Sequence, residues 1–500
     1  MKQLSHNGVL LPKYEFKGFK NRFRGKIVRL TPEQEEMAVA WSRKIGTPYV
    51  DDSTFRKNFF GDFSKSLDIK EKIGYEDFDF SEIIDWIESE RLKKENMSRE
   101  EKKKLAEKRK MVRETNKEKY GFAIVDGERV EVGAYAAEPA GIFMGRGKHP
   151  LRGKWKRSIK HNEITLNLSP DSPVPKGKWK EIVWQPDSMW IAKWDDPLRG
   201  KEKYIWLAET SPLKQIRERN KYDRSKKLEG KIEKIRSHIE KNLISCNIKR
   251  RKIATVCYLI DTLKLRVGDE KDKDEADTVG ATTLRPGHIN FLDQNTILFD
   301  FLGKDSIPFR ESIKVLPQVY NNMREFAESS SSAIFNGVRS DSVSAFLSEV
   351  AKGVSAKVFR TYYATETVKE FLKNTKVTKK TESWKKKEFL TMANLEAAIL
   401  LNHKKAIPKN YKKTLEKRRA RLKELKTKKM TPKRIENIQK LRSRIRIMTE
   451  TKGYNLNTSL KSYIDPRVIY RWGKRIDYNW RDYYSKSLER KFEWIEKSWA

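Results

Sequence analysis

The sequence predicts an α+β protein of more than one domain, and three observations support this class. A chain of 500 residues exceeds what one hydrophobic core usually supports, so about two to four domains are expected. Short strand-like runs separated by Gly, Pro and Asp crowd into residues 121–207. Residues 213–406 instead carry mostly helical patterns, with one strand pair around residues 296–310.

The first 120 residues are expected to begin with strands and turns and to continue as helices. Thr31, followed by Pro32 and Gln34, predicts a capping box with proline at the first helical position. Ser98 and Glu101 predict the start of another helix, so densely charged that it must be solvated.

Further on, strands are expected at residues 122–125, 129–132, 164–168, 182–184, 190–194 and 204–207.

Residues 409–450 predict a separate basic hairpin of two helices. The segment holds 17 Lys and Arg against 4 Glu, so we expect a short antiparallel coiled coil with a cationic surface. A turn and a new N-cap are expected at Thr431 and Pro432. The apolar stripes are Leu415, Leu422 and Leu425 before this turn, and Ile438, Leu441, Ile445 and Met448 after it.

The charge balance narrows the class of partner. Lys and Arg number 109 against 69 Asp and Glu, which leaves a formal net charge of +40. Such an excess favours a polyanion, because each phosphate contact releases condensed counterions. Ribosomal, histone-like and membrane-surface proteins share this trait. Since 37% of the residues are hydrophobic, the chain can form real cores and is not a disordered basic tail.

Several chemistries lack their motif in this sequence. It contains no phosphate-binding GxxxxGK[ST] loop, no HExxH and no paired CxxC, and its two cysteines, Cys246 and Cys257, match no metal spacing. Neither ATP nor a required metal is therefore expected as a cofactor. No apolar stretch suits a signal peptide or a membrane span, which predicts an intracellular protein.

Five side chains that suit phosphodiester chemistry lie at the ends of predicted elements: Arg266, Lys304, Arg360, His403 and Tyr463. A phenol can attack phosphorus, guanidinium and imidazole groups can stabilise charge on phosphate oxygens, and an ammonium can protonate the leaving oxygen. Because a phenol has a reference pKa of about 10, it needs neighbouring cations to become a good nucleophile. The set predicts transesterification of a DNA backbone.

Two of these residues, near the middle of the chain, can also be explained without a catalytic role. Arg266, expected to close a helix over residues 253–265, can instead form an internal ion pair with Asp269 or Glu270. Lys304 is expected at the tip of a β-hairpin, where a lysine is usually solvated. Both interpretations stay open on the sequence alone.

The other three residues have alternatives of the same kind. Arg360 is expected in the first turn of a helix over residues 355–373, as an anion contact or as a surface charge. His403 is expected to end a helix over residues 392–402, as a buried cap or as a donor to a phosphate oxygen. Tyr463, considered without the other four residues, would be interpreted as a tyrosine that packs in a hydrophobic core.

A second basic feature runs from Arg146 to Lys160, with seven cations and no acid. Gly145 and Gly147 flank Arg146 and allow the backbone to approach a ligand closely. With Trp155 interleaved, the stretch predicts a phosphate or minor-groove contact, and an ordinary surface loop is the alternative. Its cations are Arg146, Lys148, Arg152, Lys154, Lys156, Arg157 and Lys160.

Several further motifs follow one another along nearly the whole chain. They are Phe55-Arg56-Lys57-Asn58-Phe59-Phe60, Gly145-Arg146-Gly147 with His149-Pro150, Leu265-Arg266 through Ala276-Asp277-Thr278-Val279-Gly280, residues 299–307, Arg360-Thr361-Tyr362, Asn402-His403, and Tyr463 with Asp465-Pro466-Arg467. In this order the motifs resemble the eukaryotic-type family of type IB DNA topoisomerases. Together they are far more specific than a lone tyrosine or a lone basic patch.

The resemblance implies a two-lobed clamp around double-stranded DNA. Residues 1–212 would form the mixed α/β cap and core lobe, and residues 213–406 a mostly helical catalytic core of the tyrosine recombinase and type IB topoisomerase kind. Residues 409–450 would be the coiled-coil linker and residues 451–500 the C-terminal domain. The protein would be a monomer that relaxes positive and negative supercoils without ATP or a required metal.

The resemblance also implies a role for each candidate residue. Tyr463 would attack a backbone phosphate and form a 3′-phosphotyrosyl bond, while Lys304 would protonate the departing 5′ oxygen. Arg266, Arg360 and His403 would stabilise the transition state.

Further positions are expected to contact DNA near the cleaved bond. Most of these residues match positions where the family contacts DNA, and Lys148 is included because it belongs to the basic stretch from Arg146 to Lys160. Ser462 stands where nuclear members usually carry Asn, which leaves the sensitivity to camptothecin-like poisons open. The expected DNA contacts are Arg146, Lys148, Lys203, Asp305, Asn402 and Ser462.

Two other functions fit part of the pattern. A tyrosine recombinase uses a similar residue set but would need a synaptic oligomerisation surface and sequence-specific arms, neither of which is visible. A non-catalytic DNA-binding protein explains the charge but not the five aligned residues. The sequence starts without the long charged extension of nuclear members, which predicts a cytoplasmic, nucleoid-associated enzyme, with a nuclear one as the alternative.

Overall fold

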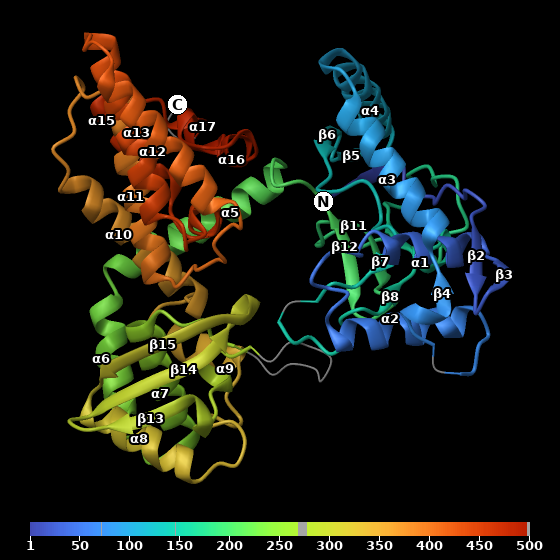
Figure 1. Cartoon of the computed structure of the whole chain (residues 1–500). Helices are drawn as coiled ribbons and strands as arrows, with labels where there is room; N and C mark the ends of the chain where they lie inside the picture. The colour runs from blue at the N-terminus through green and yellow to red at the C-terminus, as the bar shows by residue number, and fades with distance from the viewer. Residues whose placement is uncertain (72, 146, 269–277, 498–500) are drawn as a thin grey trace. The chain divides into compact units, whose positions relative to one another are not determined.

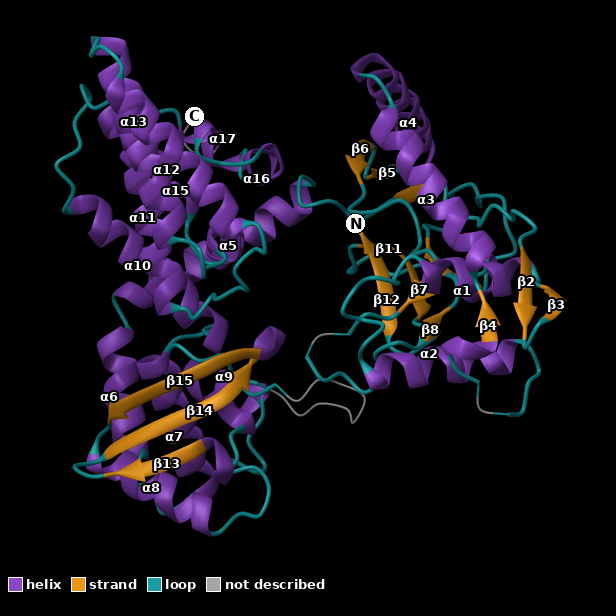
Figure 2. Ribbon diagram, in the orientation of Figure 1, coloured by secondary structure: helices purple, strands orange, loops and turns teal. Residues whose placement is uncertain are grey.

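A computed structural model describes residues 1–71, 73–145, 147–268 and 278–497 (Figure 1). These residues form two compact units, one over Met1–Lys214 and one from Gln215 onward. Helices and strands occur in both units, which confirms the predicted mixture of α and β structure (Figure 2). No helix of the described part is both long enough and apolar enough to cross a membrane.

The first unit combines four helices with several small sheets. Its helices are α1 (Pro32–Ser42), α2 (Ser53–Ser66), α3 (Ser81–Asn96) and α4 (Arg99–Tyr120). The capping box predicted at Thr31 is present, and the helix predicted to start at Ser98 also begins with a capping box. Helix α4 is solvated as expected, because none of its residues is buried. The core of this unit is rich in aromatic side chains from α1 and α2, such as Trp41 stacked on Phe59.

The strands of the first unit are short and pair in four sheets. A three-stranded sheet has the order β1-β5-β6, a four-stranded one the order β10-β9-β11-β12, and another three-stranded one the order β3-β2-β4, while β7 pairs with β8. The strands are β1 (Leu4–His6), β2 (Lys20–Phe23), β3 (Lys26–Arg29), β4 (Phe78–Asp79), β5 (Phe122–Val125), β6 (Glu128–Glu131), β7 (Gly141–Ile142), β8 (Trp155–Lys156), β9 (Thr165–Asn167), β10 (Glu181–Val183), β11 (Trp190–Asp195) and β12 (Glu202–Trp206).

The second unit is mostly helical and contains one antiparallel sheet of order β13-β14-β15. Its strands are β13 (Ile289–Leu292), β14 (Thr296–Gly303) and β15 (Ile307–Lys314), and the sequence predicted only the pair β14 and β15. The helices are α5 (Pro212–Glu229), α6 (Ile232–Asn242), α7 (Ile248–Leu263), α8 (Pro317–Glu328), α9 (Ser340–Ser348), α10 (Ala356–Lys373), α11 (Ser383–Leu400), α12 (Tyr411–Thr427), α13 (Pro432–Glu450), α14 (Leu456–Ser462), α15 (Pro466–Ile476), α16 (Lys486–Lys491) and α17 (Trp494–Lys497).

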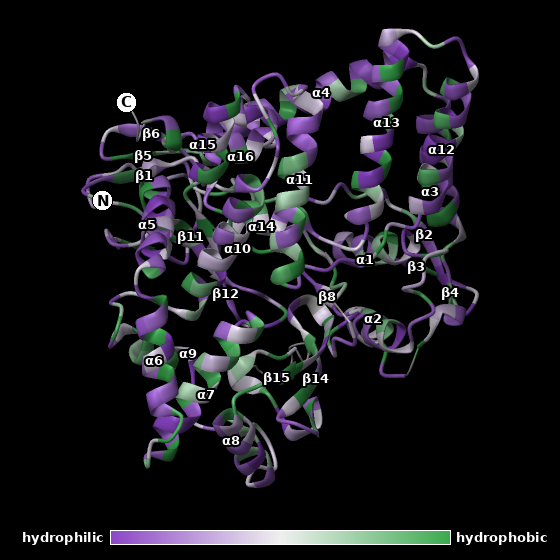
Figure 3. Cartoon of the chain, turned by 90° about the vertical axis from the view of Figure 1, so that its left-hand side faces the viewer, coloured by the Kyte–Doolittle hydropathy of each residue, from purple (hydrophilic) through white to green (hydrophobic). Residues whose placement is uncertain are grey.

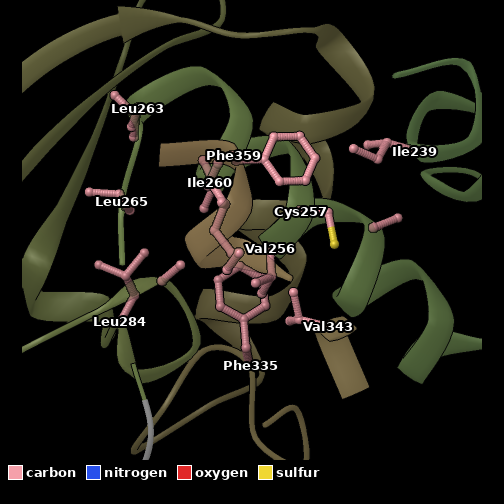
Figure 4. Close-up of a cluster of buried hydrophobic side chains, with 14 of the residues drawn as sticks. Ile239, Val256, Cys257, Ile260, Leu263, Leu265, Leu284, Phe335, Val343 and Phe359 are labelled. Carbon is pink, nitrogen blue, oxygen red and sulfur yellow. The ribbon is translucent and has the colours of Figure 1, made fainter. Parts of the chain in front are cut away.

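Two hydrophobic cores position the candidate residues of the second unit. In the first, Val256 and Ile260 of α7 pack with Phe335 and Phe359 (Figure 4). The sheet adds side chains such as Phe299 to this core. The second core joins α10, α11 and α15 and contains the predicted nucleophile itself. The helices and strands whose ends carry the candidate residues are therefore well packed.

The predicted basic hairpin forms as two helices, α12 and α13. The two helices pack on each other, and the N-cap expected at Thr431 accepts a hydrogen bond from the backbone of Arg434. Both helices are largely hydrophilic with interspersed apolar positions (Figure 3). Leu415 and Ile438 are the buried apolar residues of their helices, and α13 also packs on α11. A regular coiled coil stays a prediction.

Candidate active site

Arg266 lies beyond the end of helix α7. The helix ends at Leu263, and Lys264 adopts a left-handed backbone conformation with φ of 53°. The prediction that Arg266 closes the helix is therefore wrong, because the chain turns away two residues earlier. The predicted alternative partners, Asp269 and Glu270, lie outside the described residues.

Tyr463 follows α14 and is only 4% exposed. Its hydroxyl oxygen accepts a hydrogen bond of 2.9 Å from Nη1 of Arg266. The guanidinium carbon of Arg360 lies 5.2 Å from the centre of the phenol ring, and the His403 ring centre is also 5.2 Å away. The site thus brings together a phenol, two guanidinium groups and an imidazole, and the hydrogen bond from Arg266 to Tyr463 spans 197 residues of sequence.

Arg360 is buried, with 5% of its surface exposed, and lies in the second turn of α10. It donates to the backbone carbonyls of Lys264 and Leu401, which lie at the ends of α7 and α11, and the second of these bonds measures 3.0 Å. Arg360 is the fifth residue of α10, just beyond the first turn in which it was expected, and its side chain points to neighbouring helix ends. Its buried Nε has no hydrogen-bond partner among the described residues, which leaves one donor for an incoming oxygen.

His403 lies three residues after the end of α11, which starts nine residues earlier than the sequence predicted. Its Nε2 is 3.3 Å from Nη2 of Arg360, and its Nδ1 is 2.7 Å from Oγ of Ser459. Because a guanidinium has no acceptor, Nε2 must accept from Arg360 and the ring proton resides on Nδ1. The imidazole is 5% exposed, as the alternative of a buried histidine predicted. Its ring does not cap its own helix but hydrogen-bonds to Arg360 of α10 and Ser459 of α14. The end of α11 is capped by the backbone N–H of His403, which donates to the carbonyl of Ala398.

The buried cations control the charge states of the site. Burial by itself raises the pKa of the Tyr463 phenol, but Arg360 and Arg266 outweigh it, and the pKa lies below the ordinary value of 10.0. Burial lowers the pKa of Arg360 to about 10, an effect that the phenol opposes and Arg266 reinforces. The phenolate is thus stabilised as a nucleophile requires.

The stability of the protein should depend on pH through His403. Burial, followed by the charges of Arg360 and Arg266, lowers its pKa from 6.5 to about 3. Between these values the unfolded chain binds a proton that the folded chain does not, so stability is complete above pH 6.5 and falls as the pH drops toward 3. His403→Gln should flatten the plot of unfolding free energy against pH by about 1.4 kcal/mol per pH unit in this window. Equal slopes for both proteins, measured by urea unfolding, contradict this account.

Lys304 lies at the tip of the β14–β15 hairpin, as predicted. Gly303 pairs with Ile307, and the three residues between them form a 3₁₀ turn. Lys304 is exposed and lines one pocket together with Arg266, Arg360, Asn402 and His403. Tyr463 contacts this lining through Arg266. Four of the five predicted residues therefore line one concave site in the second unit, and the fifth, Tyr463, is hydrogen-bonded to one of them.

Comparisons with known proteins agree along the whole chain. Residues 210–436 match the catalytic core of eukaryotic DNA topoisomerase I, residues 1–207 match its DNA-binding fragment, and residues 435–500 match a C-terminal topoisomerase domain. Human DNA topoisomerase 1 is 32% identical over 99% of this chain and 70% of the relative. The chain belongs to the eukaryotic DNA topoisomerase I family.

Other relatives cover different shares of their own length. The mitochondrial DNA topoisomerase I of Pan troglodytes is 33% identical over 99% of this chain and 89% of the relative. DNA topoisomerase 1 alpha of Arabidopsis thaliana is 38% identical over 98% of this chain. The chain spans 58% of the length of that Arabidopsis protein and of its beta counterpart.

The DNA contacts expected for this topoisomerase I family chain are only partly described. Arg146 and the side chain of Asp305 lie outside the described residues. Asn402 lines the pocket with a left-handed backbone, φ 51°, and Ser462 is the last residue of α14, directly before the phenol. Lys148 is exposed in the first unit. These positions are compatible with DNA contact, which stays a prediction.

The basic stretch of the first unit is less cationic than its sequence indicated. Acidic residues outside the stretch form ion pairs with most of its described cationic side chains, so the absence of acids within the stretch was misleading. The pairs are Arg152 with Asp52, Lys154 with Asp62, Lys156 with Glu138 and Asp196, and Arg157 with Glu163. Lys203, a predicted DNA contact, also pairs with Glu138 at 3.2 Å.

Several residues that shape the site were missed from the sequence. Ser459 is fully buried and holds Nδ1 of His403, and its hydroxyl can also donate to that nitrogen if the ring proton moves to Nε2. The carbonyls of Lys264 and Leu401 orient Arg360. No local pattern marks these groups, because each acts through a contact with a distant helix end.

Proposed function

We propose that this chain is a type IB DNA topoisomerase that relaxes positive and negative supercoils. The observation that carries the proposal is the buried phenol of Tyr463, hydrogen-bonded to Arg266 and flanked by Arg360, in a chain of the topoisomerase I family. The phenolic oxygen attacks a backbone phosphorus, a 3′-phosphotyrosyl bond forms, and the bond from phosphorus to the 5′ oxygen breaks. Because one phosphodiester replaces another, the reaction needs no ATP, and religation is its reverse.

The surrounding side chains supply the charge stabilisation that this reaction requires. Arg266, Arg360 and His403 face the developing negative charge on the non-bridging oxygens, where loss of one donor commonly costs about 10²–10³ in rate. Lys304, at the hairpin tip, donates the proton that the departing 5′ oxygen takes up. His403 first has to yield its Nε2 contact with Arg360 before it donates to a phosphate, and Ser459 can hold the ring in either tautomer.

The proposal extends to the organisation of the chain on DNA. Residues 1–212 and 213–406 would form the two lobes of a clamp around double-stranded DNA, with residues 409–450 as a coiled-coil linker and residues 451–500 delivering the tyrosine. The enzyme would act as a monomer without a required metal. Its location, nucleus or nucleoid, stays a prediction.

Relaxation of a supercoiled plasmid in EDTA without ATP tests the proposed function. We expect full relaxation of positively and negatively supercoiled plasmid under these conditions. Activity that appears only with magnesium or only with ATP overturns the assignment. A reaction confined to one defined DNA sequence, with exchange between two sites, would instead identify a recombinase.

Replacing Glu138 should strengthen DNA binding. Burial raises the pKa of Glu138, but Lys156 and Lys203 outweigh burial and keep it ionised, so its half-exposed carboxylate occupies two lysines that face a phosphate in the proposed complex. Asp196, 2% exposed, holds Lys156 at 2.9 Å and stays in place. Glu138→Gln should tighten binding by about fivefold, equivalent to ~1 kcal/mol.

Fluorescence anisotropy of a labelled duplex at two salt concentrations measures this effect. All proteins in this measurement also carry Tyr463→Phe, so that no covalent adduct with DNA contributes to the measured affinity. Glu118→Gln, which breaks an exposed pair with Arg129 in the same unit, is the matched control and should leave affinity unchanged. Unchanged or weaker binding by Glu138→Gln contradicts competition between the carboxylate and the phosphate.

A further inference from the structure

The backbone that leads into Tyr463 is held by side chains from three other helices. The carbonyl of Lys461 accepts from Nζ of Lys491 at 3.2 Å, and the carbonyl of Ser462 accepts from Nζ of Lys221 at 3.1 Å. The carbonyl of Tyr463 itself accepts from the Thr365 hydroxyl at 3.2 Å. Three consecutive carbonyls at the end of α14 therefore have side-chain donors, where a helix leaves its last carbonyls without partners.

One carboxylate holds the two lysines in place. Glu218 of α5 lies 2.5 Å from Nζ of Lys221, one turn along the same helix, and 3.2 Å from Nζ of Lys491 on α16. The three side chains are 16%, 17% and 7% exposed, in that order. Burial lowers the pKa of Lys221 to about 8, although Glu218 opposes this effect. Two buried ammonium groups beside one carboxylate are costly unless their remaining donors are used, and here the carbonyls before Tyr463 use them.

Helix α5 also holds the chain on the other side of the tyrosine. Asp223 accepts from Nη1 of Arg467 at 2.6 Å, and Arg467 in turn pairs with Asp465 at 2.7 Å. Asp465 is the N-cap of α15, so this pair fixes the start of the helix that follows the nucleophile. The motif Asp465-Pro466-Arg467 thereby connects to α5, a role that the sequence did not indicate.

We propose that Glu218 and Lys221 of α5, together with Lys491, are positioning residues that set the placement of the Tyr463 phenol by holding the backbone of residues 461–463. The inference rests on the proposed function, because it concerns attack by that phenol on a phosphate. A displacement of about 1 Å between reacting groups can cost about 10²-fold in rate. The ammonium groups act on the peptide carbonyls before the nucleophile and not on the reacting atoms.

Single-turnover cleavage under saturating DNA tests the proposal with Lys221→Met and Lys491→Met. We expect each variant to cleave about 10- to 100-fold more slowly, with unchanged DNA affinity in the Tyr463→Phe background and with its fold intact at the assay temperature, although the lost donor lowers its melting temperature. Lys221→Arg should restore most of the rate, because it keeps a cationic donor near the carbonyl of Ser462. Lys226→Met, an exposed lysine on the same helix, is the matched control and should cleave normally.

A substrate with sulfur in place of the bridging 5′ oxygen separates positioning from leaving-group chemistry. A thiolate leaves without a proton, so this substrate should rescue Lys304→Met but not Lys221→Met. Rescue of Lys221→Met by sulfur, a cleavage rate within twofold of wild type, or a loss of DNA affinity that accounts for the slower reaction each overturns the proposal. If Lys221→Met is too unstable to measure, a Lys221→Arg protein with normal stability but no better rate than Lys491→Met overturns it as well.

The same assay distinguishes failure of this inference from failure of the proposed function. If wild-type protein forms no covalent adduct with DNA, the proposed function itself fails. If wild-type protein forms the adduct at Tyr463 and the lysine variants match its rate, only the positioning role fails.

Discussion

Replacing Tyr463 with Phe will abolish DNA cleavage and leave DNA affinity intact. The ring is 4% exposed within a hydrophobic core, and phenylalanine keeps that packing, so the variant loses only the hydroxyl and its hydrogen bond from Arg266. Loss of a nucleophile should lower the cleavage rate by about 10⁴-fold or more. Denaturant trapping of the reaction, followed by mapping of the adduct, measures the effect.

Tyr470→Phe is the matched control for this variant. Tyr470 packs against the same core from α15, and its loss of hydroxyl should leave cleavage unchanged. The adduct of the wild-type protein should join the Tyr463 oxygen to a 3′ phosphate. Cleavage by Tyr463→Phe at the wild-type rate, or an adduct on the 5′ end of the broken strand, contradicts the mechanism.

Replacing Arg360 should have the second-largest effect, on both rate and stability. Arg360→Met removes the charge that most strongly favours the Tyr463 phenolate, so the pKa of that phenol should rise. The cleavage rate should fall by about 10²–10³-fold. The carbonyls of Lys264 and Leu401 also lose their donor, which should destabilise the fold by about 1–3 kcal/mol for each unsatisfied group.

Tyrosine-selective ¹³C labelling measures the phenol titration directly, with Tyr463→Phe used to assign the signal. Arg360→Lys separates charge from geometry, because it keeps a cation but cannot donate to both carbonyls as a planar guanidinium does. Arg324→Met, which breaks an exposed pair with Glu328 on α8, controls for the loss of an arginine and should change stability by less than about 0.5 kcal/mol. An unchanged Tyr463 pKa in Arg360→Met excludes the proposed electrostatic role.

Features that depend on neighbouring residues were predictable from the sequence. The N-caps at Thr31, Ser98 and Thr431 and the β14–β15 hairpin with Lys304 at its tip formed where expected. Each depends on hydrogen bonds over three or four residues, so local composition suffices. The same reasoning failed at the end of α7, where Lys264 adopts a left-handed conformation and the helix ends at Leu263, before the predicted end at residue 265.

Predictions about charge failed where the compensating group lies far along the chain. The basic stretch after Arg146 contains no acid, yet Asp52, Asp62, Glu138 and Asp196 reach it from other segments. Electrostatic interaction depends on distance in space, so counting charges along a sequence overestimates the free cations of such a surface.

The sequence by itself determined the composition of the site: a phenol, two guanidinium groups, an imidazole and an ammonium, in the order of one enzyme family. The tertiary structure alone decided how these groups relate, because Arg266 reaches Tyr463 across 197 residues and Arg360 is oriented by the ends of two other helices. It also decided which side chains hold the backbone at the nucleophile, namely those of α5, α10 and α16. Such contacts depend on how packed helices bring their ends together, and no periodicity within one segment encodes that arrangement.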